Sequence, residues 1–472
     1  MASMVFSSPV FLFYFLPLFL VIYYWTRPTW RAAVLTFFSY VFYGWWNWRF
    51  VFLMLLTTTI DYHCGGAIAG FKSLARKRFF LLVSITANLT LLGFFKYFNF
   101  FTDNTQSVLQ IWGLSLPDSW LSLNVVLPVG ISFYTFQSMS YSIDIYRGYA
   151  KPSPDFLSFA SYISMFPQLV AGPIIRYSYL AEQLLAPKFS TERFYLGLQY
   201  FIFGLAKKVL IADPTSFLAD GVFNWQGPQI LSSLETWLGL LAYTVQIYFD
   251  FSGYSDMAVG LGLFCGFSFP INFDSPYKSA SITEFWRRWH ITLSTWLRDN
   301  LYIPMGGSHY GTKKTYRNLI FTMLLGGLWH GASWNFVIWG GLHGAYLAAE
   351  RALGERNGLQ RLPSWLQVAV TFLIIAFTWI FFRATTLQGA VDFIGRLLTS
   401  DWSFSVAKSL PNIKLGLGGL VVGLVIIFTC KNTWHLSTAA TWPKTIYLAL
   451  LFVLSIIFLF GSVTHPFLYF QF

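Results

Sequence analysis

Long apolar runs, separated by short basic or polar stretches, repeat from one end of the chain to the other. A helix needs about 20 apolar residues to cross the hydrocarbon core of a bilayer. By that criterion membrane spans are predicted near residues 9–25, 31–46, 50–69, 79–101, 125–146, 193–212, 231–249, 317–330, 332–349, 364–382, 414–430 and 443–462. Segments 154–175, 253–269 and 387–399 are predicted to be further spans, re-entrant helices or surface helices. The pattern therefore predicts an all-α polytopic membrane protein with about 11–13 membrane helices plus re-entrant or interfacial helices.

Composition agrees with this interpretation, because only 11% of the 472 residues are charged and 56% are hydrophobic. A soluble domain has about 25% charged residues. A chain so poor in charge cannot cover itself with a solvated surface, so the lipid bilayer is its expected environment. No linker or internal repeat divides it, and a single domain over residues 1–472 is predicted. The three cysteines lack metal-ligand or disulfide spacing, so no metal is expected.

The net charge of +12 is better explained by membrane topology than by nucleic-acid binding, and no nucleic-acid partner is expected. Basic residues follow the first span, cluster at 71–78 and recur at 147–153. Segment 102–124 carries two aspartates and no lysine or arginine. Because basic loops stay in the cytoplasm, the N-terminus and segment 102–124 are predicted to lie outside. In a Gram-negative inner membrane that side is the periplasm.

Charged and histidine side chains gather in one stretch, residues 243–345, which is the predicted catalytic region. Such groups inside a membrane usually mark function or a tightly paired structural role. The stretch includes Asp250, Asp256, Asp274, Glu284, Arg287, Arg288, His290, Arg298, Asp299 and three further histidines. Two segments, 167–173 and 246–256, combine polar and helix-breaking residues. They are expected either to line a cavity or to pack helices closely.

Residues 281–300 are predicted to form one amphipathic helix. Ser281 and Glu284 fit a capping box at its start. Apolar residues share one face, whereas the three arginines of this segment occupy the other, and His290 lies at the boundary. The helix is either a plain interfacial anchor or a basic platform for an anionic donor such as coenzyme A.

His330 lies in the apolar segment Leu324–Gly331, LLGGLWHG, among three glycines that remove side-chain bulk. A lone histidine in such a run is either a hydrogen-bonded core residue or a general base. His343 follows 13 residues later, which is not the i, i+4 spacing of a helical zinc site.

Several motifs, taken together and in order, resemble one family. They are Pro167–Pro173 (PQLVAGP), Gln246–Asp256, Phe285–His290 (FWRRWH), Trp296–Asp299, Tyr302–Gly307 and Leu328–Gly331. With the start Met4–Ser8, they make the chain similar to the membrane-bound O-acyltransferases, in particular the bacterial alginate O-acetylation subgroup. The resemblance covers essentially the whole chain.

This resemblance implies helices around a tunnel or funnel, with His330 as the catalytic residue and His290 as a second catalytic position. It implies acetyl-CoA as a cytoplasmic donor and no bound cofactor. The implied donor-binding residues are Arg287, Arg288 and Arg298, and the implied lining residues are Gln246, Asp250, Asp256, Trp329 and Asn335.

The resemblance further implies acetylation of a secreted polysaccharide with periplasmic or membrane-anchored acetyltransferase partners. Alginate is the first expectation, then cellulose or another exopolysaccharide, then peptidoglycan. The alternative is a secondary transporter or export scaffold without acyl chemistry, because broken helices and buried polar residues suit transporters too.

Overall fold

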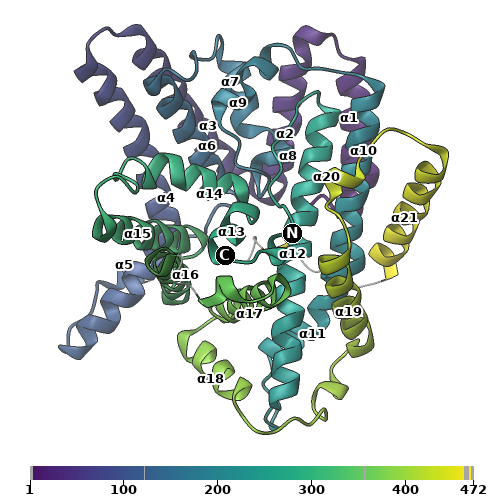
Figure 1. Cartoon of the computed structure of the whole chain (residues 1–472). Helices are drawn as coiled ribbons and strands as arrows, with labels where there is room; N and C mark the ends of the chain where they lie inside the picture. The colour runs from purple at the N-terminus through teal and green to yellow at the C-terminus, as the bar shows by residue number, and fades with distance from the viewer. Residues whose placement is uncertain (1–3, 122, 355–357, 462–466, 469–472) are drawn as a thin grey trace. The chain divides into compact units, whose positions relative to one another are not determined.

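The computed structural model describes residues 4–121, 123–354, 358–461 and 467–468, and within them the chain consists of helices joined by loops (Figure 1). No strand occurs in these ranges. Within the same ranges, five helical stretches are long and apolar enough to cross a membrane: Arg49–Gly70, Leu74–Ile111, Thr191–Phe223, Ser364–Arg383 and Trp442–Gly461. Two shorter apolar helices are Phe11–Trp25 and Ile413–Thr429. The predicted all-α membrane class is confirmed, and the count of spans stays a prediction.

The chain forms two compact units, and a division of this kind leaves the single-domain prediction open. The first unit extends to Gly197 and includes Leu261–Phe269. Its helices are α1 (Leu16–Trp25, preceded by a π-helical turn), α2 (Arg31–Asn47), α3 (Arg49–Gly70), α4 (Leu74–Ile111), α5 (Asp118–Leu121), α6 (Ile131–Arg147), α7 (Phe156–Ser164), α8 (Phe166–Leu169), α9 (Tyr177–Leu185) and the first part of α10 (Thr191–Ala206), which continues into the second unit. The hydroxyl of Tyr23 donates to the carbonyl of Cys265 over 2.9 Å, which ties the 261–269 segment to α1.

The first unit is held together by both aromatic and polar contacts. The ring of Phe166 lies 5.0 Å from that of Phe19, edge to face, in a cluster of α1 and α8 rings. Elsewhere in the unit the buried Asp61 of α3 accepts a hydrogen bond from Ser84 over 2.5 Å and from Asn88 over 2.8 Å. Both donors are on α4, so the Asp61 carboxylate links α3 to α4 by hydrogen bonds. Interhelical hydrogen bonds of this kind add to the van der Waals packing between helices in a membrane.

The second unit comprises Leu198–Gly260 and the described residues from Pro270 onward. Its helices are α11 (Asp213–Phe223), α12 (Ser233–Phe264, whose last residues belong to the first unit), α13 (Ile282–Arg288), α14 (Ile291–Leu297), α15 (Thr312–His330), α16 (Trp334–Leu353), α17 (Ser364–Arg383), α18 (Leu387–Leu397), α19 (Ile413–Thr429), α20 (Thr433–Leu436) and α21 (Trp442–Gly461). π-Helical segments at Lys207–Ala212 and Arg298–Tyr302 precede α11 and follow α14.

Helices α15 and α16 form a closely packed pair in which glycines replace larger residues. A Cβ on Gly327 would lie 2.2 Å from the carbonyl oxygen of Phe336, and one on Gly331 would lie 2.0 Å from the Phe336 ring. Neither distance is tolerable, so both positions need glycine. These two glycines therefore accommodate α16, whereas the sequence suggested that they leave space around the imidazole of His330.

The prediction of one helix over residues 281–300 is wrong, because the backbone breaks at His290. His290 adopts a left-handed conformation with φ of 44° between α13 and α14. On either side of the break the backbone bonds to a neighbouring strand-like segment: Ile291 N–H donates to Asn272 O, and Asp274 N–H donates to Arg288 O. These bonds replace helical ones, which is why an unbroken apolar pattern does not give an unbroken helix.

Two further expectations need correction. Segment 246–256 lies inside the continuous 32-residue helix α12, whereas a span end had been expected beside it. Helix α4 runs through 38 residues to Ile111, so the first part of the predicted outer segment 102–124 is helical. In α12 the aspartates pair with lysines of another helical segment, whereas the polar residues of this part of α4 hydrogen-bond to carbonyls of their own helix. The expected break at 167–173 is confirmed, since α8 ends at Leu169.

Candidate active site

A cavity of about 430 Å³ lies within the second unit. Its walls come from α13, α14, α15 and α16, and from the π-helical segment after α14. His330 lines this cavity together with two of the predicted donor-binding residues, Arg287 and Arg298. Other lining residues are Thr283, Trp286, Ile291, Leu293, Ser294, Thr295, Leu297, Tyr302, Leu319, Thr322, Met323, Gly326, Trp339, Leu347 and Arg351. An imidazole and several guanidinium groups thus share one space lined by apolar and hydroxyl side chains.

His330 is the last residue of α15 and is only 4% exposed. Aromatic rings surround its imidazole: the ring centroids of Trp329, Trp339 and Phe382 lie 5.0, 5.1 and 5.2 Å away, all close to edge-on. Edge-to-face arrangements of this kind are favourable for aromatic rings. The imidazole is therefore packed among aromatic rings at the cavity wall.

His290 is fully buried and does not line the cavity. Its Nδ1 lies 3.2 Å from Asn272 Oδ1, which also accepts a hydrogen bond from the Thr292 N–H. An amide oxygen only accepts, so Nδ1 is the donor in this pair. Burial lowers the pKa of His290 to about 3, which keeps the ring neutral near pH 7.

The two predicted catalytic histidines pack against the same indole. The Trp329 ring centroid lies 6.0 Å from that of His290 and 5.0 Å from that of His330. Only His330 borders the cavity, so the geometry gives the two residues different surroundings. His290 sits where its ring can support Trp329, and His330 sits where its ring can meet a ligand.

The arginines divide into two sets. Arg287 and Arg298 line the cavity and are exposed. Arg298 also pairs with Asp299 over 2.6 Å. Arg351 of α16 lines the same cavity, although the sequence gave no reason to select it. The predicted span ended at residue 349, and a single arginine just beyond a span looks like an ordinary interfacial residue.

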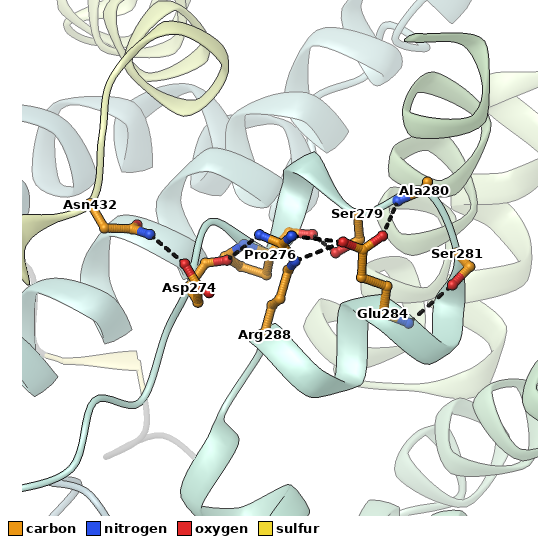
Figure 2. A network of polar contacts seen from close by, with 8 residues as sticks. All are labelled: Asp274, Pro276, Ser279, Ala280, Ser281, Glu284, Arg288 and Asn432. Carbon is orange, nitrogen blue, oxygen red and sulfur yellow. Dashed lines mark hydrogen bonds and ion pairs between the residues drawn. The ribbon is translucent and has the colours of Figure 1, made fainter. Parts of the chain in front are cut away.

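Arg288 belongs to a separate polar network, shown in Figure 2. Its guanidinium pairs with Glu284 over 2.7 Å and donates to the carbonyl of Asp274 over 3.2 Å. Asn432 donates to the Asp274 carboxylate, while Glu284 accepts from the Ala280 N–H. Arg288 thereby fastens the end of α13 to the preceding loop. The predicted capping box is confirmed in its first half, since the Ser281 hydroxyl accepts from the Glu284 N–H over 3.1 Å.

Helix α13, which carries Arg287, is attached to α16 by a carboxylate. Glu350 accepts hydrogen bonds from the backbone N–H groups of Ile282 and Thr283 over 2.6 and 2.9 Å. These are orphan donors at the N-terminus of a helix, where a negative charge is favourable. This contact fixes the position of α13, which forms one wall of the cavity, relative to α16.

The two acidic residues on α12 that were predicted to line the site lie in ion pairs. Asp250 pairs with Lys208 over 2.7 Å, and Lys208 also pairs with Asp213 over 2.8 Å. Asp256 pairs with Lys207 over 2.6 Å. Gln246 is buried on the same helix, and none of these side chains borders the cavity described above.

The two other predicted lining residues, Trp329 and Asn335, do not line the cavity either. Trp329 packs between the histidines, and Asn335 donates to the Ala384 carbonyl over 2.6 Å. Asn335 therefore joins the start of α16 to the end of α17. A role for either residue at the site stays a prediction.

Comparison with known proteins places these residues in a family context. The model of the membrane-bound O-acyltransferase family matches residues 82–387, which include His290, His330 and every cavity residue. A probable alginate O-acetylase of Pseudomonas putida is 43% identical over 99% of this chain and all of the relative. Another, of Pseudomonas aeruginosa, is 46% identical over 90% of this chain and 80% of the relative. A peptidoglycan O-acetyltransferase of Helicobacter pylori is 35% identical over 99% of this chain and 98% of the relative.

Proposed function

Because the chain belongs to the membrane-bound O-acyltransferase family and is a multi-pass O-acetyltransferase, we propose that it passes acetyl groups across the inner membrane for O-acetylation of a secreted polysaccharide. The donor is cytoplasmic acetyl-CoA. The observation that carries the proposal is a single cavity bordered by His330 and by Arg287, Arg298 and Arg351.

The cavity suits a donor with an anionic end and a thin reactive end. Guanidinium groups bind phosphate through charge-assisted hydrogen bonds, and the exposed Arg287 and Arg298 line the cavity. The remaining wall is largely apolar, with Trp286 and Trp339 among its members, and suits the pantetheine arm. The thioester would then reach the buried His330.

His330 acts on the acceptor hydroxyl. As general base, its imidazole takes the hydroxyl proton while the oxygen attacks the thioester carbon. The C–S bond breaks, and the coenzyme A thiolate that leaves recovers the proton. A nucleophilic role, in which the imidazole carries the acetyl group before the acceptor takes it, uses the same position. Exclusion of water by the surrounding rings protects the thioester from hydrolysis.

Alginate is the first candidate for the final acceptor. Two relatives that are 43% and 46% identical are named probable alginate O-acetylases. Peptidoglycan is the second candidate, because a relative that is 35% identical over nearly its whole length is named a peptidoglycan O-acetyltransferase. Cellulose remains a further candidate on the sequence resemblance alone. Periplasmic or membrane-anchored acetyltransferases are the partners that would place the acetyl group on the polymer.

The test identifies the acetyl donor, the membrane face from which it is used and the polymer that is acetylated. Inside-out and right-side-out membrane vesicles carrying the protein are given acetyl-CoA labelled in the acetyl group. We expect thioester consumption and label transfer only when the cytoplasmic face is accessible. Ester-linked acetate is then measured in alginate, cellulose and peptidoglycan from a deletion strain with and without the gene. Equal consumption from either face, or no change in any polymer, contradicts the proposal.

A further inference from the structure

His343 has no part in the function proposed above, yet it is fully buried beside the cavity. It lies on α16, two turns before Glu350, so both residues face α13. Its Nδ1 accepts a hydrogen bond from Trp286 Nε1 over 3.2 Å. Its Nε2 lies 3.1 Å from the hydroxyl of Thr378 on α17. One imidazole therefore links three helices of the second unit.

The partners fix the tautomer of this ring. An indole N–H only donates, so Nδ1 of His343 carries a lone pair. The hydroxyl of Thr378 already donates to the carbonyl of Ile375 over 2.7 Å, so it accepts from Nε2. The ring is neutral, with its proton on Nε2, and each polar atom has one defined role.

The ring also packs against the aromatic side chains that line the cavity. Trp339 lies 4.7 Å from His343 and 5.1 Å from His330, centroid to centroid, so one indole separates the two imidazoles. Trp286 lies 5.1 Å from His343 nearly edge-on. Both tryptophans border the cavity, and Trp286 immediately precedes Arg287.

We propose that His343 is a positioning residue for the acetyl transfer. Its lone pair holds the indole of Trp286 as a wall of the donor cavity, and its ring holds Trp339 against His330. The inference rests on the proposed function, because it assigns the cavity to the donor. The two contacts differ in consequence: loss of the Trp286 bond weakens donor binding, whereas loss of the packing on Trp339 disturbs the catalytic ring.

Three substitutions separate these contacts. His343→Phe keeps an aromatic ring against Trp339 but removes the acceptor for Trp286. His343→Asn restores an acceptor, because its Oδ1 is as many bonds from the backbone as Nδ1. Trp286→Phe removes the donor from the other side. For His343→Phe we expect the KM for acetyl-CoA to rise about fivefold to tenfold, with kcat within about twofold.

Rescue by His343→Asn and the behaviour of the double variant make the test specific for the hydrogen bond between His343 and Trp286. His343→Asn should recover most of the KM, and Trp286→Phe should match His343→Phe. The double variant should be no worse than either single one, since both remove the same bond. His343→Ala should lower kcat as well, because Trp339 loses its support. An unchanged KM in His343→Phe, or additive losses in the double variant, would overturn the proposal.

A spectroscopic measurement keeps this inference distinct from the proposed function. In protein labelled with ¹⁵N-histidine, the signal absent from His343→Asn belongs to His343. We expect an unprotonated Nδ1 and a protonated Nε2, and Trp286→Phe should shift only Nδ1. If the wild-type protein consumed no acetyl-CoA, the proposed function would fall, while this spectrum would still decide whether His343 holds Trp286. A protonated Nδ1 would overturn the inference by itself.

Discussion

Two groups of polar and charged side chains in the second unit look alike in sequence and differ in their surroundings. In the ion-pair cluster, Lys208 lies between Asp213 and Asp250, and Lys207 pairs with Asp256. Around the His330 cavity, the polar groups face an open volume of about 430 Å³. Burial of charge in a membrane marks either function or paired structure. The presence of a cavity is what separates the two here.

The difference has a geometric origin. Lys207 and Lys208 are consecutive residues at the start of the π-helical segment Lys207–Ala212, and they pair with different carboxylates, so the charges compensate each other locally. In the cavity region, short helices α13 and α14 meet the α15–α16 pair at a backbone break. A helix that ends or breaks leaves space and polar ends that a continuous helix does not. The cavity arises where regular packing stops.

The largest expected effect concerns His330, which belongs to the group of polar residues around the cavity. His330→Ala should reduce acetyl transfer by about 10²–10⁴-fold, because general-base help is worth that factor. The amount and monodispersity of detergent-extracted protein should stay close to wild type. The measurement is labelled acetate transferred per mole of folded protein. Normal transfer by the variant would remove His330 from the reaction and make His290 the leading candidate.

The opposite result is expected for the ion-pair cluster. Lys208→Met leaves two buried carboxylates without their shared cation, and removing one partner of a buried pair costs about 3–5 kcal/mol. The yield and thermal stability of the protein should fall sharply, while transfer per mole of the surviving folded protein should stay near wild type. Fluorescence-detected size exclusion gives the yield. A well-folded Lys208→Met protein that is inactive would place the cluster in the reaction.

Sequence patterns were sufficient for the helical class, whereas the catalytic region 243–345 and the role of His330 stay predictions. Apolar run length and the density of polar residues depend on composition, which is visible without a structure. The break at His290 was not predictable, because it depends on backbone hydrogen bonds to residues 272–274. Those residues lie outside the periodic pattern that predicts the helix. Asp250 was predicted to line the site, and only the fold reveals that it pairs with Lys208.

Arg351 and Arg288 illustrate the same limit for the donor site. Helical periodicity placed Arg287, Arg288 and Arg298 on one polar face, but adjacent residues on a short helix point about 100° apart. Arg287 meets the cavity and Arg288 meets Glu284. Arg351 comes from another helix, so no local pattern could bring it to the same place.

The different surroundings of these arginines predict a smaller effect on donor binding, for which Arg288 provides a matched control. Arg287→Gln and Arg351→Gln should each raise the KM for acetyl-CoA about threefold to tenfold, less at high salt, because the groups are partly exposed. Arg288→Gln is the control from the same helix and should leave that KM unchanged while lowering thermal stability. Initial rates at several salt concentrations give the comparison. A larger KM change in Arg288→Gln than in Arg287→Gln would reverse the assignment.

The smallest expected effect concerns His290, which is buried like the ion-pair cluster and donates a hydrogen bond to the Asn272 amide oxygen. Its pKa is lowered by burial to about 3, whereas an unfolded histidine titrates near 6.5. A base with a lowered folded pKa is stabilising above pH 6.5, and that stability is lost as the pH falls toward 3. The wild-type protein should therefore lose stability between pH 7 and pH 5.

His290→Asn isolates this contribution. Asparagine tolerates the left-handed backbone at this position and does not titrate. The pH-dependent loss of stability between pH 7 and pH 5 should be smaller in the variant by up to about 2 kcal/mol, because the unfolded state no longer gains a proton there. Thermal unfolding of the detergent-solubilised protein at both pH values provides the measurement, and all other titrating groups are shared by the two proteins. Identical pH dependence would mean that His290 is protonated to the same extent folded and unfolded. Its burial against Trp329 would then have to include a compensating negative group, and His290 would join the ion-pair side of the comparison.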